Sequence, residues 1–385
     1  MTTECTDLSG PLPTSSVMAP EAGSTAAPAL KDRLRDILDD HEALLGLYRD
    51  LAVLRRIDEQ CLALARQGAL ALWAPIVGQE AVLVGAARAA DRHDHLFISY
   101  RESLMAHLRG VPPEQVLPMW RGSALGGWDP AEYGITNPAI IVGAHGLHAT
   151  GYAMAAALDG SQDRAIAFFG DGATSQGDLN EALNFAATTT APVVFFCTNN
   201  QFAISVPIAQ QTAVQPAQRA HGFGIPSLRV DGNDVLAVLA ATRTATAHVQ
   251  AGGGPYFVEA VTYRLGPHTT NDDPTRYRSA AELEAWRARD PVERMRGFLA
   301  DSGLITESDA DVVRSAADDA AQRYRTACAE LPEPDAAGIF EHVYAAPHPL
   351  IVEERHAYAD YLASLGGAAA TAVPAGPSTG KEVPR

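Results

Sequence analysis

The sequence is poor in basic residues and in cysteine. Of its 385 residues, 29 are Lys or Arg and 46 are Asp or Glu, so the formal net charge is −17. No basic cluster is present that could contact a phosphate backbone, which argues against nucleic-acid binding. The cysteines are scattered and show no spacing typical of zinc ligands, so we expect buried apolar thiols in a reducing cytoplasm. They are Cys5, Cys61, Cys197 and Cys328.

Long apolar runs and targeting signals are also missing. No stretch reaches the roughly 20 apolar residues that span a membrane, and no repeat with a solenoid period is present. Residues 1–30 contain no Lys or Arg, unlike a secretory signal or a mitochondrial presequence. Because residues 1–30 and 366–385 are rich in small and polar residues, we predict disordered tails there. These absences predict a cytoplasmic protein that does not enter a membrane.

Strands and helices are predicted to alternate through the middle of the chain. With 47% hydrophobic residues, the chain can bury a large core. Alternation of this kind implies a mostly parallel sheet with helices on both faces. We therefore predict one α/β domain over residues 31–365, with helical extensions at both ends. Strands are predicted at 164–169, 193–197, 228–230 and 256–263. Helices are predicted at 30–67, 79–90, 102–108, 115–121, 146–158, 175–189, 235–250 and 307–331, with another beginning at 290.

The most informative segment runs from Gly170-Asp171-Gly172 to Asn199-Asn200. Two glycines after a buried strand allow a sharp turn and close approach of a ligand, and Asp171 offers the hard oxygen that magnesium prefers. The next helix directs its free N–H groups to the same place, which favours anionic oxygens. Asn200 leaves the following strand at the same edge of the sheet. Either half alone is ordinary turn chemistry, but together they predict a site for a magnesium-bound diphosphate.

This segment resembles the thiamine diphosphate motif of the alpha subunits of 2-oxoacid dehydrogenase complexes. The resemblance extends from about Leu44 to Tyr344 and is carried by several short motifs in a common order. These are 66–68 (Arg-Gln-Gly), 78–81 (Gly-Gln-Glu-Ala), 99–102 (Ser-Tyr-Arg-Glu), 140–144 (Ile-Ile-Val-Gly-Ala), 229–234 (Arg-Val-Asp-Gly-Asn-Asp) and 262–268 (Thr-Tyr-Arg-Leu-Gly-Pro-His).

The resemblance implies a cofactor, a metal ion and residues that hold them. Thiamine diphosphate supplies the decarboxylation chemistry, and Mg²⁺ binds Asp171, Asn200 and the carbonyl of Phe202. Four further groups complete the expected cofactor site. The backbone from Gly170 through Gly172 to Ala173 meets the diphosphate. Arg101 also contacts the diphosphate, with Tyr100 alongside. The backbone of Ile140 and Val142 meets the aminopyrimidine, and His268 lies at the reacting end of the cofactor.

His268 is the expected catalytic residue. It follows a predicted strand in a loop, where catalytic groups are often found, and histidine binds anions or transfers protons near neutral pH.

Departures from the family pattern limit which residue roles the resemblance implies for this chain. Pro267 stands where branched-chain relatives often have a second histidine, and Thr269 replaces the serine that mitochondrial relatives phosphorylate. Ala144 and His145 replace Thr and Gln near a potassium ion in mammalian relatives, and Phe202 replaces a common Tyr.

The resemblance also implies partners. In two-subunit relatives the beta subunit supplies the glutamate that activates the cofactor, so we expect an alpha2–beta2 heterotetramer and a lipoyl-bearing acyltransferase downstream. Segments 72–75 and 121–128 look like those of bacterial branched-chain enzymes. Leu72, Trp73 and Ile76 are predicted either to line an apolar substrate pocket or to belong to the core. The expected substrate is 2-oxoisovalerate, with pyruvate second and acetoin third.

A non-catalytic scaffold subunit of the complex remains the alternative function of another class. A nicotinamide-binding dehydrogenase is a further rival, although no Gly-x-Gly-x-x-Gly in the required context is present.

Overall fold

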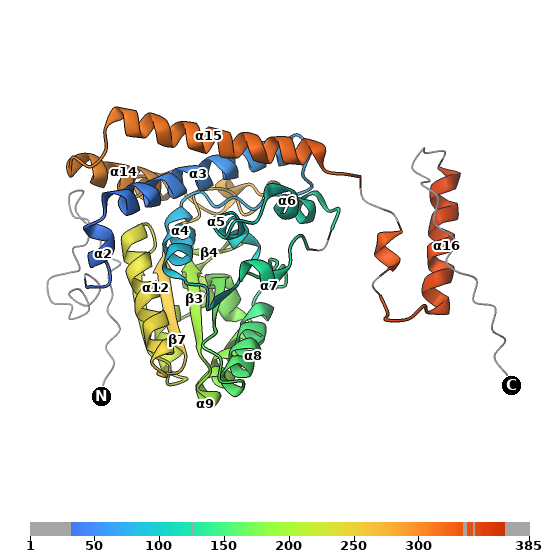
Figure 1. Cartoon of the computed structure of the whole chain (residues 1–385), viewed down its shortest axis with the longest axis horizontal. Helices are drawn as coiled ribbons and strands as arrows, with labels where there is room; N and C mark the ends of the chain where they lie inside the picture. The colour runs from blue at the N-terminus through green and yellow to red at the C-terminus, as the bar shows by residue number, and fades with distance from the viewer. Residues whose placement is uncertain (1–31, 125, 334–336, 342, 366–385) are drawn as a thin grey trace. The chain divides into compact units, whose positions relative to one another are not determined.

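The computed structural model describes residues 32–124, 126–333, 337–341 and 343–365 (Figure 1). The predicted disordered tails lie outside these ranges. The chain separates into two compact units at Leu331, and each is described by itself.

The secondary structure of the described chain is mainly helical. The strands are β1 (Asp94–Phe97), β2 (Arg164–Gly170), β3 (Val193–Asn199), β4 (Phe202–Ala203), β5 (Val206–Pro207), β6 (Ser227–Asp231) and β7 (Tyr256–Val261). The α-helices are α2 (Arg35–Leu38), α3 (His41–Arg66), α4 (Glu80–Ala89), α5 (Met105–Leu108), α6 (Pro113–Arg121), α7 (Pro130–Tyr133), α8 (Ala144–Leu158), α9 (Gly177–Thr189), α10 (Ile208–Gln211), α11 (Pro216–His221), α12 (Val235–Gln250), α13 (Ala280–Arg287), α14 (Pro291–Asp301), α15 (Glu307–Glu330) and α16 (Pro349–Ser364). Short 3₁₀ helices are η1 (Tyr100–Glu102), η2 (Asp171–Ser175), η3 (Pro274–Arg276) and η4 (Gly338–Phe340).

The first unit is built on a parallel sheet, as predicted. Five strands pair in the order β1-β2-β3-β7-β6, and every pairing is parallel. Gly170 at the end of β2 pairs with Thr198 near the end of β3, so the segments that follow these strands leave the sheet side by side. A two-stranded antiparallel piece, β4-β5, follows β3.

The two faces of the sheet bury different side chains of the same strands. In β2, Ile166 and Phe168 face the larger core, which α3, α4, α12 and α15 cover. Ala165, Ala167 and Phe169 face the smaller core, which α8, α9 and α11 cover. Because successive strand residues point to opposite faces, a continuous apolar run is what a strand buried on both sides requires. This confirms the predicted α/β class.

Several boundaries differ from the predicted ones. The helix predicted at 30–67 is interrupted before His41, because Asp40 caps α3 by accepting a hydrogen bond from Ala43 N (3.1 Å). The helix predicted at 175–189 begins instead at Gly177, after the 3₁₀ turn η2. The strand β1 and the pair β4-β5 were not predicted. They are four residues long or shorter, too short for a clear hydrophobic period.

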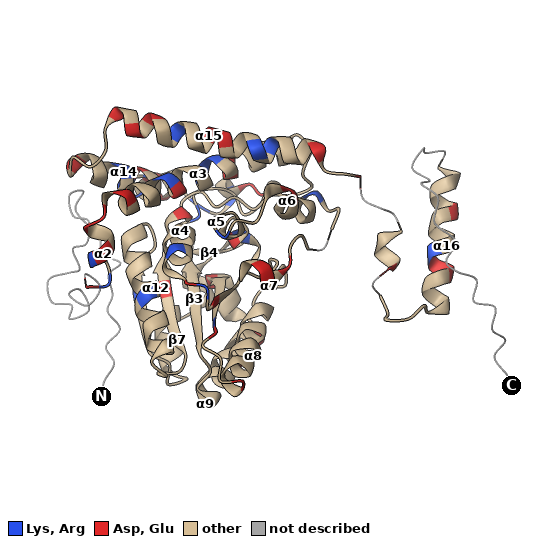
Figure 2. Ribbon diagram, viewed as in Figure 1, with Lys and Arg blue, Asp and Glu red and all other residues tan. Residues whose placement is uncertain are grey.

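Charged residues are unevenly spread over the helices. Figure 2 shows Asp, Glu, Lys and Arg residues along α3, α14 and α15, whereas α8 contains none of these four residue types. None of the helices in the described ranges is long and apolar enough to cross a membrane.

The second unit contains η4 and α16. Neither has a buried residue. Leu350, Tyr361 and Leu365 are among its exposed apolar side chains.

Candidate functional site

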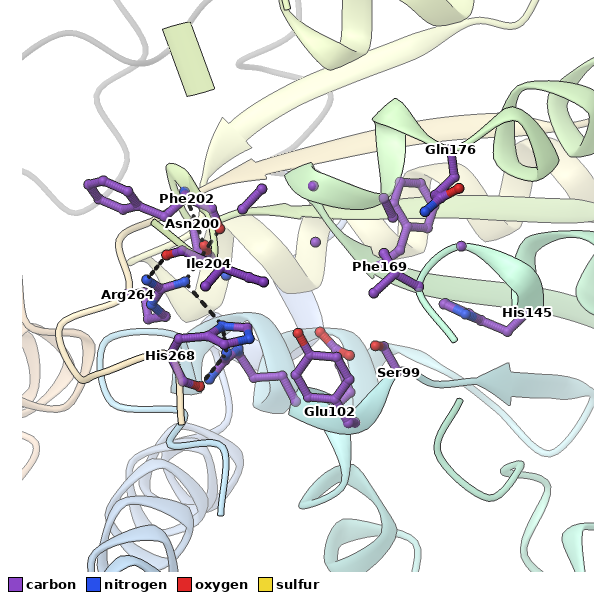
Figure 3. Close-up of a pocket in the computed structure, with 18 residues that line it drawn as sticks. Ser99, Glu102, His145, Phe169, Gln176, Asn200, Phe202, Ile204, Arg264 and His268 are labelled. Carbon is purple, nitrogen blue, oxygen red and sulfur yellow. Dashed lines mark hydrogen bonds between the residues drawn. The ribbon is translucent and has the colours of Figure 1, made fainter. Parts of the chain in front are cut away.

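A cavity of about 220 Å³ lies where β2 and β3 end. The carboxyl ends of parallel strands form the usual ligand-binding edge of such sheets. Figure 3 shows Asn200, Phe202, Ile204, Arg264 and His268 on one side of it, and Phe169, Gln176 and His145 on the other.

Most of the predicted site residues line this one cavity. Those that do are Tyr100, Arg101, Val142, Gly170, Gly172, Ala173, Asn200, Phe202 and His268. Asp171 lies directly behind the lining and is fully buried. Ile140 does not line the cavity, and its side chain is 59% exposed. Sequence segments separated by up to 168 positions are thus brought to one place.

The Gly-Asp-Gly turn uses its glycines for space rather than for a left-handed backbone. Gly170 is extended, with φ −77° and ψ 165°, and neither glycine has a positive φ. A Cβ on Gly172 would lie 2.8 Å from Cβ of Ala203, which is closer than carbon atoms tolerate. A Cβ on Gly170 would meet only Thr198 O, at 4.0 Å. The turn therefore presents an open stretch of backbone to the cavity.

Asp171 is a buried carboxylate without an ionic partner among the described residues. Its Oδ1 accepts a hydrogen bond from Asn200 N (3.2 Å), and its Oδ2 accepts one from Gln211 Nε2 (2.9 Å). Burial raises the pKa of Asp171 to about 6, although the hydrogen bond from Gln211 acts to lower it. A buried carboxylate of this kind is costly unless a cation joins it.

Asn200 lines the cavity, and two hydrogen bonds orient its side-chain amide. Phe202 N can only donate, and it donates to Asn200 Oδ1 (3.3 Å). Asn200 Nδ2 donates to Oε1 of Gln79 (3.0 Å), and Gln79 is fully buried. The amide orientation is therefore set by one protein donor and one protein acceptor rather than by solvent.

The carbonyl of Phe202, the third predicted metal ligand, already has a neighbour. Arg264 is buried and donates weakly to this oxygen at 3.4 Å, and it also donates to Ile204 O and to Tyr277 Oη (2.9 Å). A carbonyl oxygen has a second lone pair for a metal ion. Among the described residues, no group of three or more His, Cys, Asp or Glu side chains is arranged so that it could hold a metal ion. An oxygen-only shell of one carboxylate, one amide and one carbonyl does not need such a group.

Arg101 is a buried guanidinium whose positive charge is poorly compensated. It donates to Pro75 O (2.5 Å), to His268 O (2.9 Å) and to His268 Nδ1 (3.2 Å), and in the described ranges no carboxylate accepts from it. Burial lowers its pKa. The neighbouring carboxyl of Glu102 is only partly ionised at neutral pH, because burial raises its pKa to about 7. An anion in the cavity would supply the missing charge.

His268 is a neutral imidazole at physiological pH. Burial, Arg101 and Arg264 lower its pKa to about 4. Since guanidinium groups only donate, Nδ1 must accept from Arg101 and from Arg264 (3.5 Å), which places the ring proton on Nε2. His268 therefore has one hydrogen-bond donor left to offer. Asp272 holds the backbone of His268 by accepting from its N–H (2.6 Å).

The segment before α4 supports the site from behind. Asp58 accepts from Trp73 Nε1 (2.7 Å) and from Ile76 N (3.1 Å), and Pro75 O between them accepts from Arg101. Trp73 and Ile76 are each 1% exposed and do not line the cavity. Of the two alternatives predicted for Leu72, Trp73 and Ile76, the burial of the last two therefore favours the core over a substrate pocket. Two of these residues belong to the core, and Leu72 is exposed.

Several lining residues were not predicted as site residues. They are Ser99, Glu102, Gly143, His145, Phe169, Gln176, Ala203, Ile204 and Arg264. Glu102, Gly143 and Arg264 belong to the motifs at 99–102, 140–144 and 262–268, and His145 and Phe169 each adjoin a predicted motif, so position in or next to a motif was the available signal. Gln176 offered none, because only the folded chain brings it to the cavity.

The cavity combines hard oxygen donors with two guanidinium groups, although the chain as a whole is acidic. Such a site suits an anion together with a divalent cation. The residues present therefore fit a metal-bound diphosphate.

Comparison with known proteins gives a consistent result. The model of the family described as "Dehydrogenase E1 component" matches residues 49–334. The chain is 45% identical over 315 residues to the 3-methyl-2-oxobutanoate dehydrogenase subunit alpha of Mycobacterium tuberculosis, which covers 82% of this chain and 86% of the relative. It is 40% identical over 279 residues to the pyruvate dehydrogenase E1 component subunit alpha of Staphylococcus aureus, or 72% and 75% of the two chains. The resemblance predicted from the motifs is confirmed, and the chain belongs to the dehydrogenase E1 component family.

Proposed function

We propose that this chain is the alpha subunit of a complex that oxidatively decarboxylates a branched-chain 2-oxoacid of the 2-oxoisovalerate type. Membership of the family implies thiamine diphosphate as cofactor. The observation that carries the proposal is the pairing, in one cavity, of the uncompensated guanidinium of Arg101 with the oxygen donors around Asp171. The acyl group passes to a lipoyl-bearing transferase.

Magnesium would be held by Asp171, Asn200 and the carbonyl of Phe202. Three protein oxygens leave room for diphosphate oxygens and water in an octahedral shell. Bound Mg²⁺ would favour the ionised form of Asp171, which burial otherwise disfavours. The backbone at Gly172 and Ala173, which lines the cavity, would accept the diphosphate, and Arg101 would complete its charge balance.

The other residues would act at the far end of the cofactor. Val142 lines the cavity where the aminopyrimidine is expected, and Ile140 would contribute its backbone at the edge. Tyr100 meets His268 edge-on, with ring centroids 6.1 Å apart. The cofactor, when bound, supplies the nucleophilic carbon and the electron sink for decarboxylation. His268 would then donate a hydrogen bond from Nε2 to the substrate side while remaining uncharged.

A second subunit would complete the site. The cavity is smaller than the roughly 300–1,000 Å³ of sites that enclose a whole ligand. At its edge Ile141 is 75% exposed and Ile204 58% exposed, and the neighbouring helix α8 carries no charge. Exposed apolar groups of this kind mark interaction surfaces. We propose an alpha2–beta2 heterotetramer whose beta subunit supplies the activating glutamate, in the cytoplasm.

The choice of substrate rests on the relatives. Similarity to a 3-methyl-2-oxobutanoate dehydrogenase subunit favours 2-oxoisovalerate, while similarity to a pyruvate dehydrogenase subunit keeps pyruvate as the second candidate and acetoin as the third. One methylene in an apolar pocket changes specificity by only about 1–3 kcal/mol, so the preference is measurable but not absolute.

The test is decarboxylation by the chain co-purified with its beta subunit, with thiamine diphosphate and Mg²⁺, on 2-oxoisovalerate and pyruvate at matched concentrations. We expect a higher kcat/KM for 2-oxoisovalerate. A preference for pyruvate would reassign the substrate and leave the cofactor site intact. Absence of both turnover and cofactor binding would favour the non-catalytic scaffold.

A further inference from the structure

Gln211 ends the short helix α10 and reaches back to the Gly-Asp-Gly turn. Its Nε2 donates to Asp171 Oδ2 and to Val206 O, both at 2.9 Å. Both acceptors are oxygens that cannot donate when Asp171 is ionised, so the amide nitrogen must occupy this place. One side chain thus joins the carboxylate after β2 to the loop after β3.

The other end of this amide is unsatisfied. Gln211 Oε1 is buried and has no hydrogen-bond partner among the described residues. It lies 4.0 Å from the position that a Cβ on Gly172 would occupy, which places it beside the open backbone of the turn. Buried acceptors are rarely left unpaired, and an unpaired one calls for a missing donor. A water molecule in a metal shell is a donor of that kind.

The loop that Gln211 closes has an unusual backbone. Gln201 has φ 75° and Ile204 has φ 56°, both in the left-handed region that residues with a Cβ avoid. Such conformations cost of order 1 kcal/mol each and persist only where the surroundings impose them. The same loop carries Phe202, whose carbonyl is one of the three expected metal ligands. Its backbone position therefore depends on contacts that fasten the loop.

We propose that Gln211 is a positioning residue of the metal centre, which fastens the Asn200–Gln211 loop to Asp171 and offers Oε1 to a water on the ion. The inference rests on the proposed function, because it assumes the cation at Asp171, Asn200 and Phe202. Gln211 makes the ligands from two neighbouring strands into one preorganised set. Without it, the carboxylate would keep its contact with Asn200 N but would lose its second attachment to this loop.

Loss of a preorganised metal site can be told from general loosening of the protein by comparing Mg²⁺ binding with Ca²⁺ binding. Mg²⁺ demands near-ideal octahedral geometry at about 2.0–2.1 Å, whereas Ca²⁺ accepts six to eight ligands at longer and more variable distances. Loss of a positioning contact should therefore weaken Mg²⁺ binding more than Ca²⁺ binding. Outer-shell contacts of metal sites are worth about 10–100-fold in affinity.

The experiment compares Gln211→Ala with Gln210→Ala, which alters the exposed neighbour on the same helix. Each full-length variant is purified with its beta subunit. Mg²⁺ and Ca²⁺ are titrated separately at saturating thiamine diphosphate, and binding is followed by tryptophan fluorescence. We expect Gln211→Ala to weaken Mg²⁺ binding at least tenfold and Ca²⁺ binding about threefold or less. Gln210→Ala should match the unaltered protein.

Three results would overturn the inference. Unchanged Mg²⁺ binding in Gln211→Ala, with normal binding in the unaltered protein, would show that the contact is dispensable and would leave the proposed function standing. An equal loss of both ions, accompanied by a lower melting temperature than that of Gln210→Ala, would show a structural role only. If the unaltered protein binds neither ion with the cofactor, the proposed function fails and the inference fails with it.

Discussion

The cavity lining contains two sets of groups, which we call the first and the second wall, and the two are built in different ways. One wall consists of the turn after β2 and the loop after β3, which the parallel pairing of Gly170 with Thr198 places side by side. The other wall consists of Arg101 and His268, which are 167 positions apart and meet through side-chain hydrogen bonds. The first wall is mostly backbone and carboxamide, and the second is a pair of cationic or potentially cationic groups.

The two walls differ in what holds their groups in position. In the first wall, each group has a set position because a strand or a tight turn delivers it. In the second wall, Arg101 depends on Pro75 O, and that carbonyl depends on Asp58 through Trp73 and Ile76. Changes in the first wall should therefore abolish binding outright, whereas changes in the second should weaken it by degrees.

The largest effect is expected from Asp171→Ala. It removes the only carboxylate among the three expected metal ligands, so loss of Mg²⁺-dependent cofactor binding should exceed the 10–100-fold of an outer-shell contact. The measurement is equilibrium binding of thiamine diphosphate with and without Mg²⁺. Asp178→Ala, which changes an exposed carboxylate at the start of α9, is the control. Normal binding by Asp171→Ala would refute the metal assignment.

A smaller effect is expected from Arg101→Lys. Lysine keeps the charge but cannot donate to Pro75 O, to His268 and to a diphosphate at the same time. A hydrogen bond to a charged group contributes about 1.5–3 kcal/mol, so we expect cofactor affinity to fall about 10–100-fold. Arg92→Lys, at an exposed position, should have no effect. Equal affinity for Arg101→Lys and the unaltered protein would mean that only the charge matters.

The smallest effect concerns pH. The pKa of His268 is lowered to about 4, so its contribution to stability is present above the pKa of about 6.5 of an unfolded histidine. That contribution is lost as the pH falls from about 6.5 toward 4, because the unfolded chain then binds the proton more readily. Unfolding by urea at pH 7.5 and 5.5 should show a drop in stability that is smaller in His268→Asn.

The drop in stability must be compared between the unaltered protein and His268→Asn, because buried carboxyl groups change the stability with pH in the opposite direction. The pKa of Asp171 is raised to about 6, so its contribution to stability is present below pH 3.8 and is lost as the pH rises through 6. His356→Asn, at an exposed position on α16, is the control. A drop of the same size in His268→Asn and the unaltered protein would show that His268 does not titrate as described.

Much of the first wall could be predicted without coordinates. The strand before Gly170, the turn and the strand before Asn200 are contiguous apolar and glycine-rich patterns, and parallel pairing brings their ends together. For Gly172, the sequence predicted a sharp turn and close approach of a ligand. The structure adds a further requirement, because a Cβ at this position would meet Ala203. The start of the following helix was placed two residues early, since a 3₁₀ turn intervenes.

Less of the second wall could be predicted from the sequence. Arg101 and His268 were predicted from motif resemblance, but the low pKa of His268 arises from Arg264 and Arg101 closing around it. Trp73 and Ile76 were expected either at a substrate pocket or in the core because they are apolar. Burial in the core and binding of an apolar ligand require the same kind of side chain, so the sequence pattern does not distinguish the two.

The sequence by itself determined the α/β class, the family and the position of the segment from Gly170 to Asn200 that borders the cavity, because these depend on local periodicity and on short contiguous motifs. Only the tertiary structure decided that Gln79 orients Asn200 from 121 positions away, that Gln211 fastens Asp171, and that Arg101 lies buried against His268 without a carboxylate to accept from it in the described chain. Hydrogen bonds between distant residues depend on how the elements pack, and packing is not written in the spacing of any one segment.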